Sequence, residues 1–405
     1  MNVIVYYKNI EVGMLSDESG NIFFEYTPDF INTGINLSPY HLPLETGLHS
    51  NHNVDFSFLH GLFYDNLPDN FGESVIREKY GDSLSPLEKL CLIADRGIGA
   101  ITYKPDLNKE KYDSNFIDLI DAVNFSRSLI KEKPINDLTK EFVASAISAG
   151  GAMPKLLGYI SNDLKTVYRN GAKVKNAFPY LIKLDVGVSK FKSQSTKIEY
   201  VYNKMANKAG INVVNAKLLE SCSDNRTVFH LALPRYDREG NNKLHIHSYA
   251  GLRHLYFKDP SHSYDLLFRT VRGLTRNQSE VDQAFKRMIF NYISVNQDDH
   301  VKNHSFMMND SGDWHLTPAY DLTFMYNPSL NGSFMSIDGK RKNINTAHLI
   351  SFGLKHGISK NKVKEQIDEC KTSINGFMTL SNEVGITKNI SKYINAKIEN
   401  KMAEI

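Results

Sequence analysis

The chain has 405 residues, of which 41% are apolar and 23% are charged. This balance excludes a disordered or fibrous protein, and the length is typical of two or three globular domains. There are 48 Lys plus Arg and 45 Asp plus Glu, a net charge of only +3. So small a surplus does not mark the whole chain as a nucleic-acid or membrane-surface binder.

Three further features lead us to expect a cytoplasmic protein. No apolar run reaches the roughly 18 residues of a membrane span. Residues 1–8 lack the cationic segment and long apolar core of a signal peptide. Cys91, Cys222 and Cys370 lie far apart, which fits a reducing compartment and provides neither a disulfide framework nor a thiolate metal site.

The front of the chain is predicted to be β-rich. Apolar strands at residues 3–7 and 21–26 flank a turn-rich stretch at 16–20, as expected of a hairpin. A helical pattern follows over 62–80 and is interrupted at 65–70.

A second β-rich region is predicted after residue 148, interrupted by one helix. Its strands are expected at residues 156–160, 180–184, 213–214 and 228–233. In the helix, Thr196 with Glu199 three residues later has the spacing of a capping box. Gly210 stands where a C-terminal cap belongs.

From about residue 237 the pattern becomes helical. The clearest helix carries one apolar stripe, formed by Val281, Ala284, Phe285, Met288, Ile289, Tyr292 and Ile293. A dense polar loop at residues 296–300 follows directly. We therefore expect polar side chains at the end of a buried helix.

Asp298 and Asn303 have the Asp-x-x-x-x-Asn spacing of the protein kinase catalytic loop. Phosphoryl transfer needs a carboxylate to accept the proton of the attacking hydroxyl and an amide oxygen to bind magnesium. Asp321 follows a turn at 310–313, where a strand pair would return a second metal-binding carboxylate. The alternative is that Asp298 and Asp299 cap a helix and Asn303 sits in a turn.

The same loop also allows a zinc site. His300 and His304 are four residues apart, as two ligands on one helical face would be, with His315 and Asp298 nearby. However, no Glu follows His300 to complete a metalloprotease pattern, and Lys302 places a cation between the histidines. The sequence therefore favours phosphoryl transfer over metal-dependent hydrolysis.

Residues 148–155 form a loop of small side chains whose backbone N–H groups could approach phosphate oxygens, with Lys155 adding charge. The loop lacks the Walker and kinase glycine patterns, so a tight turn is the alternative. Lys183, inside an apolar strand, resembles the kinase lysine that binds the α/β-phosphates, although such a Lys usually points from the solvent face of an edge strand. Glu199 could be its ion-pair partner, but the capping box already explains that residue.

The chain after residue 340 is basic, with twelve Lys or Arg against six Asp or Glu, a balance of +6 from residue 340 onward. Such a surplus usually marks a solvated helical face. It also fits a position near DNA that a partner carries.

With these residues in place, the sequence resembles the HipA family of bacterial toxin kinases. The likeness rests on the small-residue loop at 148–155, the lysine strand at 180–184, the hinge at 233–238, and the catalytic and metal-binding loops at 297–306 and 316–322. Residues 298–303, Asp-Asp-His-Val-Lys-Asn, are the most specific part. Residues 63–70 and 97–100 resemble the family's amino-terminal subdomain.

The resemblance implies an α+β, two-lobed protein-kinase-like fold. A β-rich N-terminal lobe with an extra N-terminal subdomain would precede an all-helical C-terminal lobe. The expected division is an N-terminal subdomain at 1–110, a kinase N-lobe at 111–236 and a helical C-lobe at 237–405.

The resemblance also implies a serine/threonine protein kinase that uses ATP and Mg²⁺. Asp298 would be the catalytic proton acceptor, and Asn303 and Asp321 would bind the metal. Ser148 would be autophosphorylated, which inactivates the kinase by pulling its loop out of the nucleotide site. The implied nucleotide-binding residues are Gly150, Gly151, Ala152, Met153, Pro154, Lys155, Lys183, Pro234, Arg235, Tyr236, His300, Val301, Lys302, Asn303, Tyr320, Asp321, Leu322 and Thr323.

Known substrates of the family include aminoacyl-tRNA synthetases, notably glutamyl-tRNA synthetase, so the implied outcome is inhibited translation, growth arrest and persistence. A small helix-turn-helix antitoxin usually neutralises the kinase and brings it to operator DNA. DNA would therefore be an indirect partner, and no membrane would be involved. The alternative is a catalytically weak kinase-fold component that binds antitoxin and DNA, which the basic tail favours.

Overall fold

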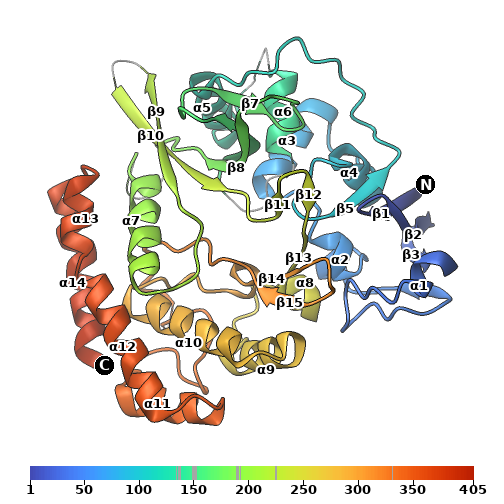
Figure 1. Cartoon of the computed structure of the whole chain (residues 1–405). Helices are drawn as coiled ribbons and strands as arrows, with labels where there is room; N and C mark the ends of the chain where they lie inside the picture. Colours follow the sequence, from blue (N-terminus) through green and yellow to red (C-terminus); the bar gives the residue numbers. More distant parts are fainter. Residues whose placement is uncertain are drawn as a thin grey trace.

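The computed structural model describes residues 1–133, 135, 138–147, 153–187, 191, 193–223, 226–330 and 332–405. In Figure 1 an N-terminal sheet lies at one side, a second sheet lies at the top, and the C-terminal helices lie at the opposite side. The predicted two-lobed, kinase-like α+β architecture with an extra N-terminal subdomain is confirmed.

The N-terminal subdomain is built on an antiparallel sheet with the strand order β4-β3-β2-β1-β5. The strands are β1 (Asn2–Tyr7), β2 (Ile10–Glu18), β3 (Asn21–Tyr26), β4 (Leu48–Ser50) and β5 (Ile101–Lys104). The accompanying helices are α1 (Pro28–Asn32), α2 (Gly61–Tyr64), α3 (Asn70–Tyr80) and α4 (Pro86–Ile93). The gap between α2 and α3 is the interruption that the sequence predicts.

The single hairpin predicted at the front of the chain is wrong, because the structure has a three-stranded meander there. Residues 10–18 form the additional strand, and its Val12 and Leu15 are buried in the core. Ser19 and Gly20 make the second turn with φ values of 55° and 87°. The turn-rich stretch at 16–20 therefore contains the end of a strand as well as a turn.

The second sheet is also antiparallel and has the strand order β7-β6-β8-β10-β9. Its strands are β6 (Lys155–Ser161), β7 (Val167–Arg169), β8 (Ala177–Lys183), β9 (Lys217–Ser223) and β10 (Arg226–Pro234). The helices of this lobe are α5 (Leu119–Ile130), α6 (Lys140–Ala146) and α7 (Ser195–Lys208). Residues 213–214 are not a strand, since Val213 makes only an isolated bridge to Ala319.

The sheet of the second lobe shares a hydrophobic core with α3 of the N-terminal subdomain. Phe71 and Val75 of α3 belong to the same buried cluster as Phe142 of α6 and Leu156 and Ile182 of the sheet. Figure 1 shows α3, α5 and α6 together beside this sheet, with α7 below it. The N-terminal subdomain is therefore fastened to the sheet that carries the predicted lysine.

The C-terminal lobe is mainly helical. Its helices are α8 (Tyr249–Arg253), α9 (Tyr264–Thr275), α10 (Gln278–Ile293), α11 (Thr346–Lys355), α12 (Lys360–Ile374), α13 (Phe377–Glu383) and α14 (Lys388–Glu404). The α10 helix is buried along the predicted stripe and ends before the polar loop. Among the described helices, none combines the length and apolar character that a membrane span requires.

The prediction that this lobe is all-helical is wrong, because it also contains short strands. The pair β11 (Arg238–Glu239) and β12 (Asn242–Lys243) precedes a sheet formed by β13 (His245–Ser248), β14 (Ser305–Met308) and β15 (Trp314–Leu316). Phe306 and Trp314 of this sheet are buried, which stabilises strands of only three or four residues. The β14–β15 hairpin returns the chain toward Asp321, as the sequence predicts.

Candidate active site

Lys183 lies at the end of the central strand β8 and joins the two lobes electrostatically. Its Nζ is 2.5 Å from Oε1 of Glu199 on α7, and it also forms an ion pair with Asp321 of the C-terminal lobe. The expectation of an edge strand with a solvent-facing lysine is wrong, since β6 and β10 flank β8 and the Lys183 side chain is only 12% exposed.

Glu199 is held by this lysine and does not form the predicted capping box. The N-cap of α7 is Gln194, whose side chain makes no capping hydrogen bond. The Thr196 hydroxyl instead donates to the carbonyl oxygen of Phe229 on β10 at 2.6 Å. Both side chains therefore have partners that are distant in the sequence. Glu199 pairs with Lys183, and Thr196 bonds to β10.

The charges around Lys183 reinforce one another. Burial opposes ionisation of Lys183, but the carboxylates of Asp321 and Glu199 outweigh it and raise the pKa of the ammonium. Burial likewise opposes ionisation of Asp321, but Lys183 and Lys155 lower its pKa to about 2. Lys183 and Asp321 therefore each favour the charged form of the other.

Asp298 and Asn303 lie in the polar loop that follows α10. The Asn303 side-chain amide donates to the backbone oxygen of Asp298 at 2.6 Å, which fixes the loop and directs the amide oxygen elsewhere. The Asp298 side chain is 47% exposed, with its Oδ1 3.9 Å from Nε2 of His300. Partial burial raises the Asp298 pKa and the charge of Asp321 adds to this, while His300 opposes it. A carboxylate of this kind suits general-base chemistry.

The loop that carries Asp321 is hydrogen-bonded directly to the loop that carries Asp298 and Asn303. The Tyr320 hydroxyl donates to the backbone oxygen of Lys302 at 2.7 Å, and the Asn296 side chain donates to the backbone oxygen of Asp321 at 3.4 Å. Asp321 itself has a φ of 52°, a left-handed conformation that is uncommon for a non-glycine residue. These contacts fix the position of Asp321 relative to the loop that carries Asp298.

Asp299 is a buried structural residue, a role that the sequence interpretation considered only in the form of a helix cap. It is 2% exposed, and its two oxygens accept hydrogen bonds from the Tyr264 hydroxyl at 2.8 Å and the Phe334 backbone N–H at 2.7 Å. Burial raises its pKa to about 6. Only the three-dimensional contacts distinguish it from the adjacent Asp298.

Several predicted nucleotide-site residues are buried or contact other parts of the fold. Val301 and Leu322 are buried in the hydrophobic core. The Lys302 ammonium lies 4.8 Å from the ring centroids of both Tyr64 and Phe257, so it points toward the N-terminal subdomain. Thr323 is partly buried beside Leu322.

The predicted hinge, residues 233–238, begins with the last two residues of β10, of which Pro234 is the final one. The Arg235 guanidinium pairs with Asp237 and donates to the Gly97 carbonyl oxygen of the N-terminal subdomain at 2.9 Å. The Tyr236 ring stacks with that of Tyr320 of the opposite lobe, with centroids 6.5 Å apart. Tyr236 is therefore a hinge side chain that contacts the loop carrying Asp321.

The small-residue loop is only partly described. Ser148, Gly150, Gly151 and Ala152 lie outside the described residues, whereas Met153 is exposed and Pro154 and Lys155 are buried. Lys155 begins β6 directly opposite Lys183. Burial lowers its pKa, while the nearby charge of Asp321 acts in the opposite direction.

The donor set of this site fits magnesium better than zinc. Asp321 provides a carboxylate and Asn303 an amide oxygen, and hard oxygen donors of this kind suit Mg²⁺. Within the described ranges no three His, Cys, Asp or Glu side chains gather as a metal site. The zinc hypothesis for His300 and His304 therefore has no third protein ligand there.

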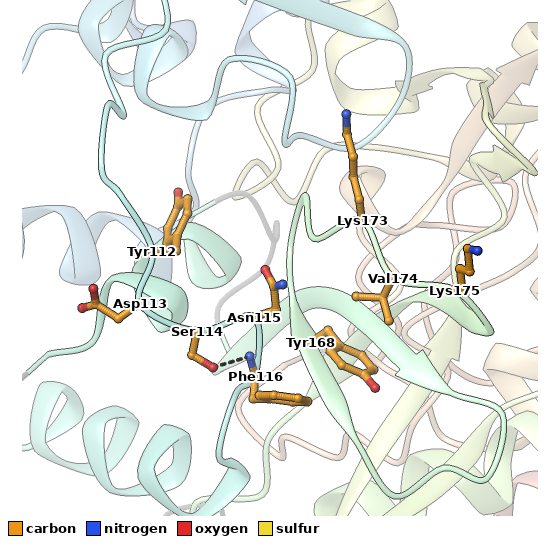
Figure 2. A pocket seen from close by; sticks show the side chains of 9 residues that line it. All are labelled: Tyr112, Asp113, Ser114, Asn115, Phe116, Tyr168, Lys173, Val174 and Lys175. Carbon is orange, nitrogen blue, oxygen red and sulfur yellow. Dashed lines mark hydrogen bonds between the residues drawn. The ribbon is translucent and has the colours of Figure 1, made fainter.

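A separate pocket of about 600 Å³ lies between residues 112–116 and the connection from β7 to β8. Figure 2 shows the aromatic side chains of Tyr112 and Tyr168 on its walls, while Lys173 and Lys175 extend in different directions away from them. Its polar groups do not converge, so we assign it no ligand.

Comparison with known proteins agrees with this geometry. Residues 3–104 match the HipA N-terminal domain, and residues 147–376 match the HipA-like C-terminal domain. A protein of Sinorhizobium fredii named "Putative kinase Y4dM" is 31% identical over 96 residues, which are 23% of this chain and 23% of that protein. The match thus spans about a quarter of that relative.

Two solved structures are also similar. The first is the complex of HipA, HipB and operator DNA from the toxin–antitoxin system of Shewanella oneidensis MR-1, with 19% identity, a TM-score of 0.69, and 99% of this chain and 96% of that chain covered. The second is the Helicobacter pylori proinflammatory kinase CtkA, with 12% identity, a TM-score of 0.42, and 63% and 90% covered. The first likeness establishes the fold.

Proposed function

The chain belongs to the HipA family, as a HipA-like kinase, and from this premise we propose that it transfers the terminal phosphoryl group of Mg-ATP to a serine or threonine of a protein. The observation that supports this most is the contact of Lys183 with both Glu199 and Asp321. Active protein kinases require an ion pair between a strand lysine and a helix glutamate, together with an aspartate that holds magnesium, and these three residue types meet here.

In this proposal each residue has one task. Mg-ATP supplies the phosphoryl group when bound, with Asn303 and Asp321 holding the metal. Asp298 accepts the proton of the substrate hydroxyl, and its partial exposure leaves it within reach of a protein substrate. Lys155 and Lys183 bind phosphate oxygens, and the hinge around Tyr236 meets the adenine.

The biological role proposed is that of a toxin in a toxin–antitoxin pair. The protein substrate would be an aminoacyl-tRNA synthetase, and a helix-turn-helix antitoxin would neutralise the kinase and bring it to DNA. We propose that the chain divides into an N-terminal subdomain at 1–110, an N-lobe at 111–236 and a C-lobe at 237–405. The related Shewanella protein was solved with HipB and its operator DNA, which supports the choice of partners.

The test compares phosphate transfer from Mg-ATP by the native protein and by Asp298→Asn. Loss of a general base lowers the rate by about 10²–10⁴-fold, so we expect a nearly inactive variant that still binds ATP. Equal transfer by both proteins would overturn the role of Asp298. A native protein that binds antitoxin and DNA but transfers no phosphate would favour the binding-component alternative.

We also propose that Ser148 is the autophosphorylation site. Mass spectrometry after incubation with Mg-ATP should show one added phosphate on the peptide that contains Ser148, and none in Ser148→Ala. An unmodified peptide from a native protein that phosphorylates other substrates would refute this assignment.

A further inference from the structure

Asp69 of the N-terminal subdomain reaches the lysines of the second lobe. It is the N-cap of α3, and its Oδ1 accepts a hydrogen bond from the Gly72 backbone N–H at 2.8 Å. Its Oδ2 is buried, has no hydrogen-bond partner among the described residues, and lies 3.9 Å from Nζ of Lys155. An N-cap needs only one oxygen, so the second oxygen is directed at the lysine for another reason.

Lys155 is in an unfavourable electrostatic position. Its side chain is 4% exposed, and it is the register partner of Lys183 on the neighbouring strand. Like charges directly opposite each other on a sheet repel, and burial favours the neutral form of a lysine. Lys183 is paired with Glu199 and Asp321, and Asp69 provides a carboxylate at ion-pair distance from Lys155, in addition to the nearby charge of Asp321.

We propose that Asp69 is a positioning residue through which the N-terminal subdomain holds the Lys155 ammonium, charged and correctly placed, for the phosphates of ATP. This inference rests on the proposed function. The distance of 3.9 Å gives an electrostatic attraction rather than a hydrogen bond. The hydrophobic core that α3, α6 and β6 share holds Asp69 and Lys155 close to each other.

The experiment is a double-mutant cycle on the full chain, with the dissociation constant of Mg-ATP as the measurement. Asp69→Asn keeps the cap, because an amide oxygen can accept from Gly72, but removes the charge. We expect Asp69→Asn to weaken binding roughly tenfold, the effect of about 1.4 kcal/mol. In a Lys155→Met background, Asp69→Asn should cause no further weakening.

Asp118→Asn is the matched control, since Asp118 caps the similar helix α5 by accepting from Ile120 and Asp121 but is exposed to solvent. It should leave ATP binding unchanged. Equal weakening of ATP binding by Asp69→Asn with and without Lys155 would assign Asp69 a purely structural role and overturn the inference. Tighter binding of ATP by Asp69→Asn would also overturn it, because it would mean that the Asp69 carboxylate simply repels the phosphates. A native protein that binds no ATP would overturn the proposed function as well, whereas native binding with an unaffected Asp69→Asn variant would overturn this inference alone.

Discussion

Lys155 and Lys183 stand directly opposite each other, as register partners in the antiparallel pair β6–β8. Their carboxylate partners come from three other elements: Glu199 from α7, Asp321 from the loop after β15, and Asp69 from the start of α3. Because removal of any one charge leaves its partners uncompensated in a buried site, the catalytic candidates also contribute to stability.

Lys183→Met should destabilise the protein as well as impair phosphate transfer. The change leaves Glu199 and Asp321 as neighbouring carboxylates without their cation, and breaking a buried pair in this way costs about 3–5 kcal/mol. Urea unfolding at pH 7 measures the loss. The double variant Lys183→Met/Glu199→Gln should recover part of it, and a single variant as stable as the native protein would contradict the pairing.

Substitution of Asp298 and of Asp299 by Ala should have opposite effects, the first on phosphate transfer and the second on stability. Asp299→Ala leaves the Phe334 N–H and the Tyr264 hydroxyl without their acceptor, at about 1–3 kcal/mol for each buried group. Asp298→Ala, the matched control, should retain stability and lose phosphate transfer. Thermal unfolding and transfer assays of both variants separate the two roles, and a stable Asp299→Ala variant would contradict the structural role.

The unfolding free energy that Asp299→Ala loses relative to the native protein should also depend on pH. Burial raises the folded-state pKa of Asp299 to about 6, above its ordinary value of 3.8. Because the folded state binds the Asp299 proton more tightly than the unfolded state does, this group stabilises the fold fully below about pH 4. The contribution is lost as the pH rises through about 6. The difference in unfolding free energy between native protein and Asp299→Ala should therefore be larger at pH 5 than at pH 7.5.

Asp237→Asn should loosen the junction between the N-terminal subdomain and the hinge. Asp237 pairs with Arg235 and Arg238 and accepts from the Gly99 N–H, and although burial opposes its ionisation, the two arginines lower its pKa to about 2. The shift from 3.8 corresponds to about 2 kcal/mol, present above about pH 4 and lost as the pH falls through 2.

Urea unfolding of Asp237→Asn at pH 7 and at pH 3 measures this contribution. The variant should be about 2 kcal/mol or more less stable at pH 7, with a smaller deficit at pH 3. Asp95→Asn is the control, because the Asp95 side chain is 71% exposed, and ion pairs of so exposed a carboxylate contribute little to stability. Equal effects of the two substitutions would contradict the proposed contribution of the junction.

Gly61→Ala should separate α2 from α8. A Cβ atom on Gly61 would lie 1.9 Å from the backbone oxygen of Gly251, and a backbone atom cannot move aside as a flexible side chain does. We expect a loss of several kcal/mol, of the order seen for severe overpacking. Gly273→Ala is the control, since its Cβ would meet only the Tyr40 hydroxyl at 3.4 Å. Similar melting temperatures for both variants would contradict the close packing.

Local patterns in the sequence determined much of this protein. The apolar stripe of α10, the interruption between α2 and α3, and the spacing of Asp298 and Asn303 are short-range features, and the structure has the helices and the polar loop where they indicate. The catalytic and metal-binding roles of these residues stay predictions. Helix and strand periodicity is a property of neighbouring residues, which explains why it can be seen without the fold.

Other features were decided only by the tertiary structure. Lys183 and Asp321 are 138 residues apart in the chain, and Glu199 is used by Lys183 although its local spacing indicates a capping box. Asp298 and Asp299 are the same residue type in adjacent positions, yet the Asp298 side chain is 47% exposed and Asp299 is buried. Pairing, burial and pKa depend on which distant groups the folded chain brings within a few ångströms, and no local pattern encodes those distances.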